Sequence, residues 1–460
     1  MLELTSLTAI SPIDGRYGDR LAYLRDFFSE FALIKRRVLV EIAWLKMLAD
    51  CPDIHEVQPL SSSAKNYLQE IIDNFSITDA ERVKAIEKTT NHDVKAIEYF
   101  LKEKIAPQAE LNKINEFIHF ACTSEDINNI AYALLLKETK ETCLLPTIKK
   151  VILALQELAT RFADQPMLAR THGQPATPTT VGKEMANFAA RLQRQYKQLE
   201  KIAIRGKFNG AVGNFNAHYA AYPEIDWLSI SRQFVENFGL EWNSYTTQIE
   251  PHDYIAELFG VITNINHILI DFNRDVWGYI AFGYFSQKRM DNEVGSSTMP
   301  HKINPIDFEN AEGNLGLANA MMNFLSSQLL TSRWQRDLVD STLLRTLGVA
   351  ISHALLAYEN TVKGISKINI NPVLLEYDLA QAWEVLAEPI QTIMRRYGIE
   401  KPYEKLKDLT RGKAIDRDRL EEFVDKLSLP DHVKQQLKQM TPRDYTGIAA
   451  QLAKDVNKDE

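Results

Sequence analysis

The segment DYIAELFGVITNINHILIDFNRDVWGYIAF, residues 253–282, decides the fold class of this chain. Its apolar side chains recur at alternating spacings of three and four residues, the pattern of a helix that buries one face. The residues on that face are Ile255, Leu258, Ile262, Ile265, Leu269, Phe272 and Val276. At 1.5 Å rise per residue, about 30 residues make a helix of roughly 45 Å. A helix of that length needs partners of similar length to cover its apolar face.

Other segments have the same periodicity and supply those partners; they are residues 131–162, 179–204, 308–330 and 343–362. Thr177-Pro178 is typical of a helix cap followed by a first-turn proline, and predicts the start of the second of these helices. Pro146 is predicted to kink or break the first. Five long helices predict an all-α protein built on an elongated bundle.

The two ends of the chain differ from its middle. Residues up to 113 predict shorter helices with polar interruptions, and after Gly364 short helices are separated by prolines and glycines. We therefore predict three domains, with the long-helix bundle in the centre. Their ranges are 1–113, 114–364 and 365–460.

Composition is that of an ordinary soluble globular protein, with 460 residues, 45% hydrophobic and 25% charged. The net charge is −8 and no long Lys/Arg block occurs, so no nucleic-acid partner is predicted. Cys51, Cys122 and Cys143 lack a C-x-x-C spacing and are expected to be reduced thiols. With no signal peptide and no uninterrupted apolar run of about 18 residues, no membrane partner is predicted and the expected compartment is the cytoplasm.

No cofactor or metal is predicted. The ten histidines are scattered without H-x-x-x-H spacing, and the cysteines form no usable pair. Neither a G-x-G-x-x-G nor a Walker A run occurs, which argues against a dinucleotide or P-loop enzyme.

The run GSSTMPHKINP, residues 295–305, is rich in hydroxyl, imidazole, ammonium and amide side chains. Gly295 relaxes the backbone at one end, while Pro300 and Pro305 forbid a continuous helix. The loop so formed is rich in donors, which suits binding an anion or removing a proton. A plain polar surface loop is the alternative.

Two polar runs precede apolar helical patterns: residues 89–93, TTNHD, and residues 123–126, TSED. Each reads as a helix cap followed by an acidic first turn. Helix N-termini are also anion sites, so capping and binding remain compatible. His172 lies in the turn THGQP, residues 171–175, where a solvated histidine and a proton donor are both consistent with the sequence.

Several cations could together bind a substrate with more than one negative charge. Arg336 lies in the run RWQRD, residues 333–337, and a nearly helical continuation places Ser341 and Arg345 on one face. Arg16 and Lys302 add to this set. Guanidinium groups favour paired contacts to carboxylate or phosphate. Surface ion pairs with the abundant acidic residues are the alternative for each.

The runs at 123–126, 171–174 and 295–305 occur in the order found in the fumarase/aspartase superfamily, which this chain resembles. Within it the chain is most similar to the adenylosuccinate lyase family in its bacterial form. The further runs that carry this similarity are SPIDGRY at 11–17, TTNHD at 89–93, TTQIEPH at 246–252 and RWQRD at 333–337. They span nearly the whole chain.

The resemblance implies a β-elimination that releases fumarate from adenylosuccinate, giving AMP, and from succinyl-aminoimidazole-carboxamide ribotide, giving AICAR. It implies Ser296 as the base and His172 as the acid. Backbone amides of the 295–298 loop, with Lys302 nearby, would stabilise the serine alkoxide once the loop excludes water. The implied substrate contacts are Arg16, Tyr17, Asn91, His92, Asp93, Thr123, Ser124, Gln248, Lys302, Asn304, Arg336, Ser341 and Arg345.

The resemblance also implies a homotetramer whose sites are shared between subunits, and the long apolar helix pattern is consistent with it. Two other readings stay open. The chain could be a different lyase of the superfamily, acting on argininosuccinate, aspartate or malate. It could instead be a catalytically inactive helical scaffold, although Ser296, His172 and the cationic runs are all present.

Overall fold

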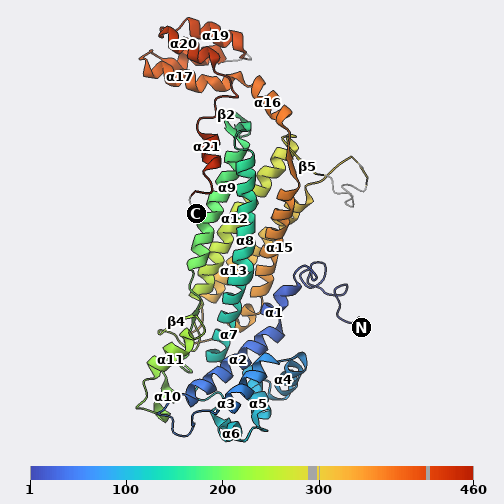
Figure 1. The fold of residues 1–460 in the computed structure, drawn as a ribbon, viewed down its shortest axis with the longest axis vertical. Helices are drawn as coiled ribbons and strands as arrows, with labels where there is room; N and C mark the ends of the chain where they lie inside the picture. The colour runs from blue at the N-terminus through green and yellow to red at the C-terminus, as the bar shows by residue number, and fades with distance from the viewer. Residues whose placement is uncertain (1, 289–297, 300, 411–414, 459–460) are drawn as a thin grey trace. The chain divides into compact units, whose positions relative to one another are not determined.

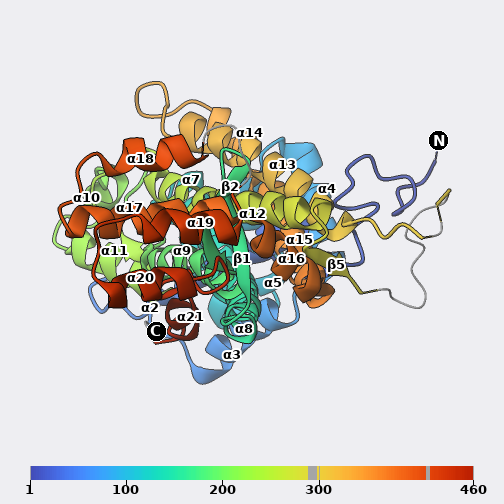
Figure 2. The same cartoon turned by 90° about the horizontal axis from the view of Figure 1, so that it is seen from above.

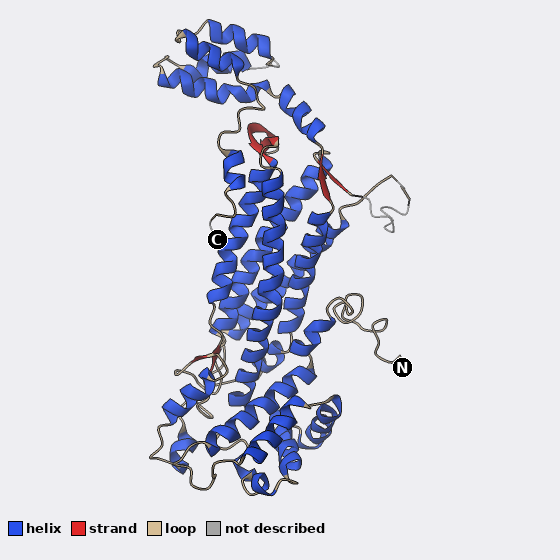
Figure 3. Cartoon of the chain, viewed as in Figure 1, coloured by secondary structure: helices blue, strands red, loops and turns tan. Residues whose placement is uncertain are grey.

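Helices dominate the computed structural model, which describes residues 2–288, 298–299, 301–410 and 415–458 (Figure 3). The strands are short and form three two-stranded sheets within this described part. The prediction of an all-α protein is therefore confirmed. The chain divides into two compact units, each assembled from segments that are distant in sequence. Unit 1 comprises Met1–Thr147, Lys197–Asn266 and Asn314–Leu356, and unit 2 comprises Ile148–Tyr196, His267–Gly313 and Ala357–Glu460.

Unit 1 contains the shorter helices of the N-terminal part and two short segments of parallel strand. The helices are α1 (Arg25–Phe28), α2 (Glu30–Ala49), α3 (Ser62–Asp73), α4 (Ile77–Thr90), α5 (Asp93–Ile105), α6 (Ala109–Asn112), α7 (Ser124–Thr139), α10 (Asn216–Ala221), α11 (Trp227–Glu236) and α14 (Val339–Leu344). The strands β3 (Arg205–Gly206) and β4 (Glu241–Trp242) pair in parallel.

Helix α2 lies at the centre of unit 1 because one of its faces is apolar along its whole length. It begins where the Ser29 hydroxyl accepts a hydrogen bond from the Ala32 amide at 3.1 Å. Near its end, the fully buried Trp44 ring lies 4.4 Å from that of Phe208, centroid to centroid. Phe234 of α11 packs edge-to-face against the same Phe208 ring, with 4.5 Å between centroids. This aromatic cluster joins α2 to α11.

The long helices are α8 (Leu145–Arg161), α9 (Val181–Lys201), α12 (Asp253–Ala281), α13 (Ile306–Leu329) and α15 (Leu347–Ser366). In unit 2 the segments of these helices run alongside one another (Figure 1). Phe272 of α12 packs against Phe188 of α9 at 5.4 Å and against Phe308 of α13 at 6.1 Å between ring centroids. All seven residues of the heptad pattern in α12 are buried, at most 1% exposed.

Helix α12 is the one helix in the described residues that is long and apolar enough to cross a membrane by length and composition. Half of its most apolar window is nevertheless buried inside the protein. Asn266 on α12 is fully buried and donates a hydrogen bond to Asn319 of α13 at 2.8 Å. These contacts are those of a core helix.

Unit 2 also holds β1 (Pro166–Thr171), β2 (Gln174–Thr180), β5 (Phe285–Gln287), β6 (Ile368–Ile370) and the helices α16 (Pro372–Gln381), α17 (Ala387–Arg396), α18 (Pro402–Thr410), α19 (Arg417–Asp425), α20 (Asp431–Gln439) and α21 (Ala449–Lys454). Helices α17 to α20 pack together (Figures 1 and 2) around a core of their own that includes Ile390, Met394, Val424 and Leu437. Because the two units are discontinuous in sequence, the three-domain division at residues 113 and 364 stays a prediction.

Two local predictions are corrected by the structure. Thr177-Pro178 does not open a helix: both residues lie in β2, and α9 begins at Val181. The helix predicted over 131–162 is two helices, because α7 ends at Thr139 and α8 begins at Leu145, one residue before Pro146. The irregularity lies just before it, as a π-helical turn at Lys140–Leu144 between α7 and α8.

Candidate active site

His172 lies at the tip of a β-hairpin in unit 2. The antiparallel strands β1 and β2 pair Thr171 with Gln174, leaving His172 and Gly173 as a two-residue turn. Both have positive φ, 53° and 76°, as a type I′ turn requires. The glycine adopts this conformation without strain, whereas His172 is held in it by the hairpin. The turn thus presents an exposed imidazole from a short rigid element.

Three polar side chains of unit 2 hold the hairpin close to its turn. Arg170, two residues before His172, donates a hydrogen bond to the Tyr284 hydroxyl at 3.4 Å and lies 3.5 Å from the Asp378 carboxylate. Tyr284 in turn donates to Asp378 at 2.7 Å. The orientation of β1 is therefore set by contacts from the start of β5 and from α16.

Lys302 and Asn304, also in unit 2, lie in the short segment before α13. The Lys302 amide donates to the Met299 carbonyl at 3.0 Å, and the Lys302 side chain is exposed. Asp307, in the first turn of α13, binds the Lys367 ammonium at 2.7 Å with both side chains buried. This pair fixes the end of the segment to α15. Ser296, the predicted base, lies outside the described residues.

Asp93 and Arg345 meet in unit 1. Asp93 begins α5 and accepts from two guanidinium groups, Arg37 at 2.7 Å and Arg345 at 3.4 Å. Arg345 also contacts Glu30 at 2.8 Å. Burial acts to raise the pKa of Asp93, but Arg37, the Val94 amide and Arg345 together hold that pKa below its usual value. Asp93 is therefore an ionised bridge between two arginines.

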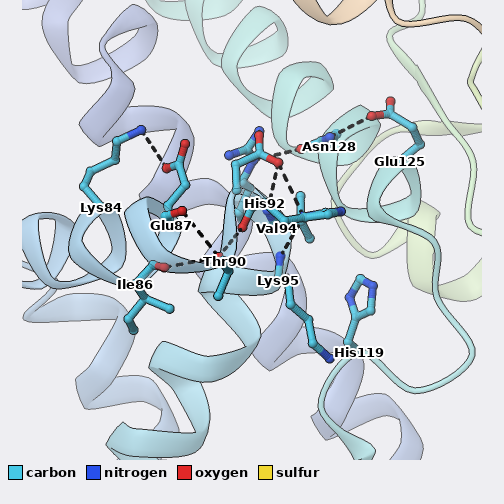
Figure 4. A network of polar contacts seen from close by, with 12 residues as sticks. Lys84, Ile86, Glu87, Thr90, His92, Val94, Lys95, His119, Glu125 and Asn128 are labelled. Carbon is cyan, nitrogen blue, oxygen red and sulfur yellow. Dashed lines mark hydrogen bonds and ion pairs between the residues drawn. The ribbon is translucent and has the colours of Figure 1, made fainter.

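Arg336 and Gln248 meet in the same unit. The Arg336 guanidinium donates to the Gln248 side-chain oxygen at 3.2 Å and to buried Glu125 at 3.0 Å. Glu125 also accepts from Asn128 at 2.7 Å, a contact drawn in Figure 4. The buried Nε of Arg336 has no hydrogen-bond partner within the described part of the chain. Within that part it is a buried donor without an acceptor, which is uncommon in folded proteins.

Ser341 lies on α14, five residues after Arg336. Its neighbour Asp340 contacts both residues. One Asp340 oxygen accepts from the Ser341 amide at 2.7 Å, and the same oxygen lies 3.8 Å from Arg336. The other oxygen lies 3.5 Å from the buried imidazole of His252. The backbone amide of His252 donates a hydrogen bond to the Glu250 carboxylate at 2.7 Å. Burial raises the pKa of Glu250. Glu250 and His252 belong to the 246–252 run that carries Gln248, so this pair ties that loop to α14.

His92, Thr123 and Ser124 occupy helix starts, as predicted, whereas Asn91 lies at the end of the preceding helix. Asn91 ends α4 in the left-handed region with φ 53°, and His92 caps α5 by accepting from the Lys95 amide at 3.2 Å. His92 is labelled in Figure 4, and its side chain is half exposed. Thr123 and Ser124 open α7, where the Thr123 amide donates to Asp126 at 2.8 Å.

The start of α7 is anchored by a fully buried ion pair. Asp126 binds the Lys207 ammonium at 2.8 Å, with neither side chain exposed, and also accepts from the amides of Asn209 and Gly210 at 3.0 and 3.1 Å. Such a carboxylate with several donors is well satisfied in spite of its burial. It fixes the half-buried Thr123 and Ser124 relative to the chain segment around residue 209.

Arg16 and Tyr17 lie in a coiled segment that packs near Arg345. Tight backbone turns, such as Tyr17 N–H to Pro12 O at 2.9 Å, hold this segment. A cavity of about 110 Å³ between this segment, α1 and α15 is lined by Asp14, Gly18 and Arg345 among others. The Arg16 side chain is exposed.

Four of the eight non-glycine residues with positive φ in the described structure lie in these runs. Among the residues with positive φ that are not glycine are Asn91, His172, His252 and Trp334, with φ between 51° and 65°. Each belongs to one of the runs singled out from the sequence. Such conformations persist where the surroundings fix them, and they are frequent at functional sites.

The structure thus divides the predicted site residues between the units. Unit 1 brings together Asp93, Gln248, Arg336, Ser341 and Arg345, and also carries Arg16, Tyr17, Asn91, His92, Thr123 and Ser124. Unit 2 carries His172, Lys302 and Asn304. In the described residues no group of three or more His, Cys, Asp or Glu side chains is placed to hold a metal ion.

Sequence reasoning missed several side chains of the unit 1 cluster: Arg37, Glu125, Asn128, Asp340 and His252. The position of Arg37 on its helix is the feature that points to it. Arg37 shares one face of α2 with Ile34, Glu41 and Trp44, and all four side chains are buried. A charged residue on such a face requires a partner. The sequence does not show which partner it has.

Two family models match the chain. One, described as "Lyase", matches residues 15–321, and the other, described as "Adenylosuccinate lyase C-terminal", matches residues 332–446. The adenylosuccinate lyase of Escherichia coli strain K12 is 59% identical over 455 residues, which cover 99% of this chain and 100% of that relative. That of Haemophilus influenzae is 58% identical over 457 residues, with 99% and 100% covered.

Solved structures show a similar fold at low sequence identity. A fumarate lyase from Mesorhizobium sp. BNC1 matches with a TM-score of 0.76 and 18% identity, covering 95% of this chain and 98% of that one. The 3-carboxy-cis,cis-muconate lactonizing enzyme of Pseudomonas putida matches with a TM-score of 0.73 and 18% identity, covering 95% and 96%.

Proposed function

We propose, from the fact that this chain belongs to the adenylosuccinate lyase family, that it cleaves adenylosuccinate into fumarate and AMP. The same elimination on succinyl-aminoimidazole-carboxamide ribotide would give AICAR. The observation that carries the proposal is the unit 1 cluster, where Arg336 contacts Gln248 and Arg345 contacts Asp93. A substrate with a phosphate and two carboxylates supplies acceptors for the guanidinium groups of such a cluster.

The guanidinium groups of the cluster are already oriented by protein carboxylates. Glu125 holds Arg336, and Glu30 and Asp93 hold Arg345. Each guanidinium carries five N–H donors, so one held from one side still has donors for a ligand on the other. Pre-orientation of this kind lowers the entropy lost on binding. Gln248, Ser341, Asn91, His92, Thr123, Ser124, Arg16 and Tyr17 complete the proposed contacts in this unit.

The proposed reaction is a β-elimination. Ser296, as the base, removes a proton from the β-carbon of the succinyl group, and the electron pair forms the double bond of fumarate. The C–N bond breaks, and His172 protonates the departing nitrogen. The exposed position of His172 on a rigid turn suits such a proton transfer. Lys302 and Asn304 are proposed to bind the substrate from the loop that carries Ser296.

We also propose that the protein is a cytoplasmic homotetramer whose sites are shared between subunits, and that it uses no cofactor or metal. Exposed apolar side chains on the long helices support assembly. Leu317 and Phe324 of α13 are 54% and 53% exposed and lie seven residues apart, so they share one face. A second copy of the chain would bury this face.

The test is ultraviolet absorbance of the purified protein mixed with adenylosuccinate, with argininosuccinate, aspartate and malate in parallel. Loss of the absorbance of the substituted purine, with fumarate formed only from adenylosuccinate, supports the proposal. Fumarate formed only from argininosuccinate or aspartate, or interconverted with malate, would keep the elimination chemistry but overturn the substrate. A folded protein inactive on all four substrates would favour the scaffold.

A further inference from the structure

Arg37 is the most deeply buried cation of the unit 1 cluster, with 2% of its side chain exposed. It lies on α2, and in the sequence it belongs to none of the polar runs described above. Its Nη2 donates to Asp93 at 2.7 Å, and its Nε donates to the Asn128 side-chain oxygen at 2.8 Å. Both distances are those of well-formed hydrogen bonds. A buried guanidinium is tolerated only with such partners.

The two partners of Arg37 lead to two different groups of proposed substrate contacts. Asp93 continues to Arg345 at 3.4 Å. Asn128 continues to Glu125 at 2.7 Å, and Glu125 to Arg336 at 3.0 Å. Asn128 and Glu125 lie next to each other in Figure 4, on the first turns of α7. Among the described contacts, Arg37 is the residue that joins the Arg345 group to the Arg336 group.

We propose that Arg37 is a positioning residue that fixes the spacing of the two arginines, Arg336 and Arg345, at which the substrate's anionic groups bind. It does not act on the reacting atoms. The inference rests on the proposed function and adds to it a buried residue that lies outside the sequence runs implied to bind the substrate.

The chemistry of the side chain explains why an arginine is present at this position. A guanidinium is planar and presents donors in fixed directions, so a single group reaches Asp93 and Asn128 at the same time. A lysine has a compact ammonium on a flexible stem and cannot keep both contacts in the same geometry. A displacement of about 1 Å at a distant supporting residue is enough to lower turnover roughly 10²-fold.

The first experiment compares Arg37→Lys and Arg37→Gln with wild type. Both variants are expected to lower kcat/KM for adenylosuccinate, Arg37→Gln by about 10²-fold, with KM rising because the displaced groups bind the substrate. Circular dichroism and thermal unfolding establish that the assayed protein is folded. Arg37→Lys keeps the buried charge, so it keeps the test available if Arg37→Gln does not fold.

The matched control is the neighbouring arginine of the same helix. Arg36 binds Glu138 on α7 and contacts no proposed site residue in the described structure. Arg36→Lys is expected to change KM by less than threefold. If Arg36→Lys raised KM as much as Arg37→Lys does, the effect would belong to α2 in general and the proposal would be overturned.

A double variant tests the route through Asp93. If Arg37 acts by holding Asp93, the effect of Arg37→Gln on KM is smaller in an Asp93→Asn background than in wild type. An unchanged effect on KM in both backgrounds would contradict the proposal. The double variant also removes both charges of the pair, and is expected to unfold at a higher temperature than Arg37→Gln alone.

The outcomes separate this inference from the proposed function. If wild type does not cleave adenylosuccinate, the function has failed and Arg37 loses its stated role with it. If wild type cleaves the substrate while folded Arg37→Lys and Arg37→Gln keep the wild-type KM, the function stands and the positioning role is wrong. If these variants have a lower melting temperature but an unchanged KM, Arg37 contributes to stability only and the positioning role is also wrong.

Discussion

Ser296 stands beside a second hydroxyl, Ser297, in the 295–305 loop, and this pair offers a sharp test of the base. Ser296→Ala is expected to fold normally and to lower kcat by about 10²–10⁴-fold, the usual contribution of a general base. Ser297→Ala removes the neighbouring hydroxyl and is expected to keep most of the activity. Steady-state rates of both variants on adenylosuccinate decide the matter. A loss of less than tenfold in Ser296→Ala would remove Ser296 from the base role.

His119 and Glu41 form an ion pair beside the start of α7 whose strength depends on pH. The His119 Nδ1 lies 2.6 Å from the buried Glu41 carboxylate. Burial acts to lower the pKa of His119, but Glu41 raises it above its usual value overall. A raised folded-state pKa stabilises the fold fully below the unfolded value of about 6.5, and this stabilisation is lost as pH rises through the folded pKa.

Glu41→Gln is therefore expected to lower the free energy of unfolding more at pH 5.5 than at pH 9. Gln keeps the shape of the side chain and one acceptor oxygen but removes the charge. Urea denaturation of wild type and variant at both pH values measures the difference. An equal loss at the two pH values would show that the pair does not titrate with folding.

At the residue scale, the sequence indicates the polar runs that are proposed to bind substrate. It indicates less well the residues that hold those runs in place. The runs that contain Asp93 and Arg336 stand out because their polar residues interrupt apolar patterns. Asp340 and Asn128 have no such contrast, since acidic and amide residues are common at helix starts. Their role depends on contacts between segments more than 30 residues apart, such as Arg37 with Asn128. No local pattern records such contacts.

Among the elements, the β1–β2 hairpin shows where a local pattern misleads. Thr177-Pro178 fits both a helix start and an edge strand, because proline sets φ in a range that both allow. Residues 177 and 178 form a strand because β2 pairs with β1. This pairing depends on a second segment of the chain and not on the local conformational preference of Thr177 and Pro178. Four of the five predicted long segments match their helices within a few residues, because their apolar pattern extends over many turns. The fifth, residues 131–162, spans parts of two helices, α7 and α8.

Gly182 fixes the junction between this hairpin and the long helices of unit 2. It is the second residue of α9, and its amide donates to the Phe162 carbonyl at 2.9 Å. A Cβ at this position would lie 2.4 Å from the Ala159 carbonyl oxygen and 2.5 Å from the Ala163 Cα. Both are backbone atoms of the preceding segment, so the backbone has to shift.

Gly182→Ala is thus expected to lower the free energy of unfolding by about 1–3 kcal/mol, the usual effect of overpacking. The matched control is Lys183→Ala at the next position. Lys183 makes a partly exposed ion pair with Glu184 on the same helix, so its loss is expected to cost about 1 kcal/mol or less. Urea denaturation measures both. Equal stability of Gly182→Ala and wild type would show that the junction can relax.

For the whole molecule, the sequence predicts the all-α class and the long helices but not the division into compact units. Unit 1 and unit 2 each combine three segments that are separated in the sequence. Composition shifts along a sequence mark changes in helix length. They do not show which distant helices pack together, because any apolar stripe is equally consistent with several partners.

The proposed tetramer is tested at the exposed face of α13. Phe324→Glu places a charge on a surface that assembly would bury, and burying an unpaired carboxylate costs several kcal/mol. We expect sedimentation velocity to show a tetramer for wild type and smaller species for Phe324→Glu. If sites are shared between subunits, activity falls together with the tetramer fraction.

The control for this experiment is Ile77→Glu. Ile77 is 60% exposed at the first position of α4, where an acidic side chain interacts favourably with the helix N-terminus. This variant also adds one exposed charge, so it is expected to remain tetrameric and active. Loss of the tetramer in both variants would reflect net charge rather than the α13 face. A wild type that sediments as a monomer and is fully active would refute both the tetramer and the shared site, because every residue of a working site would then come from one chain.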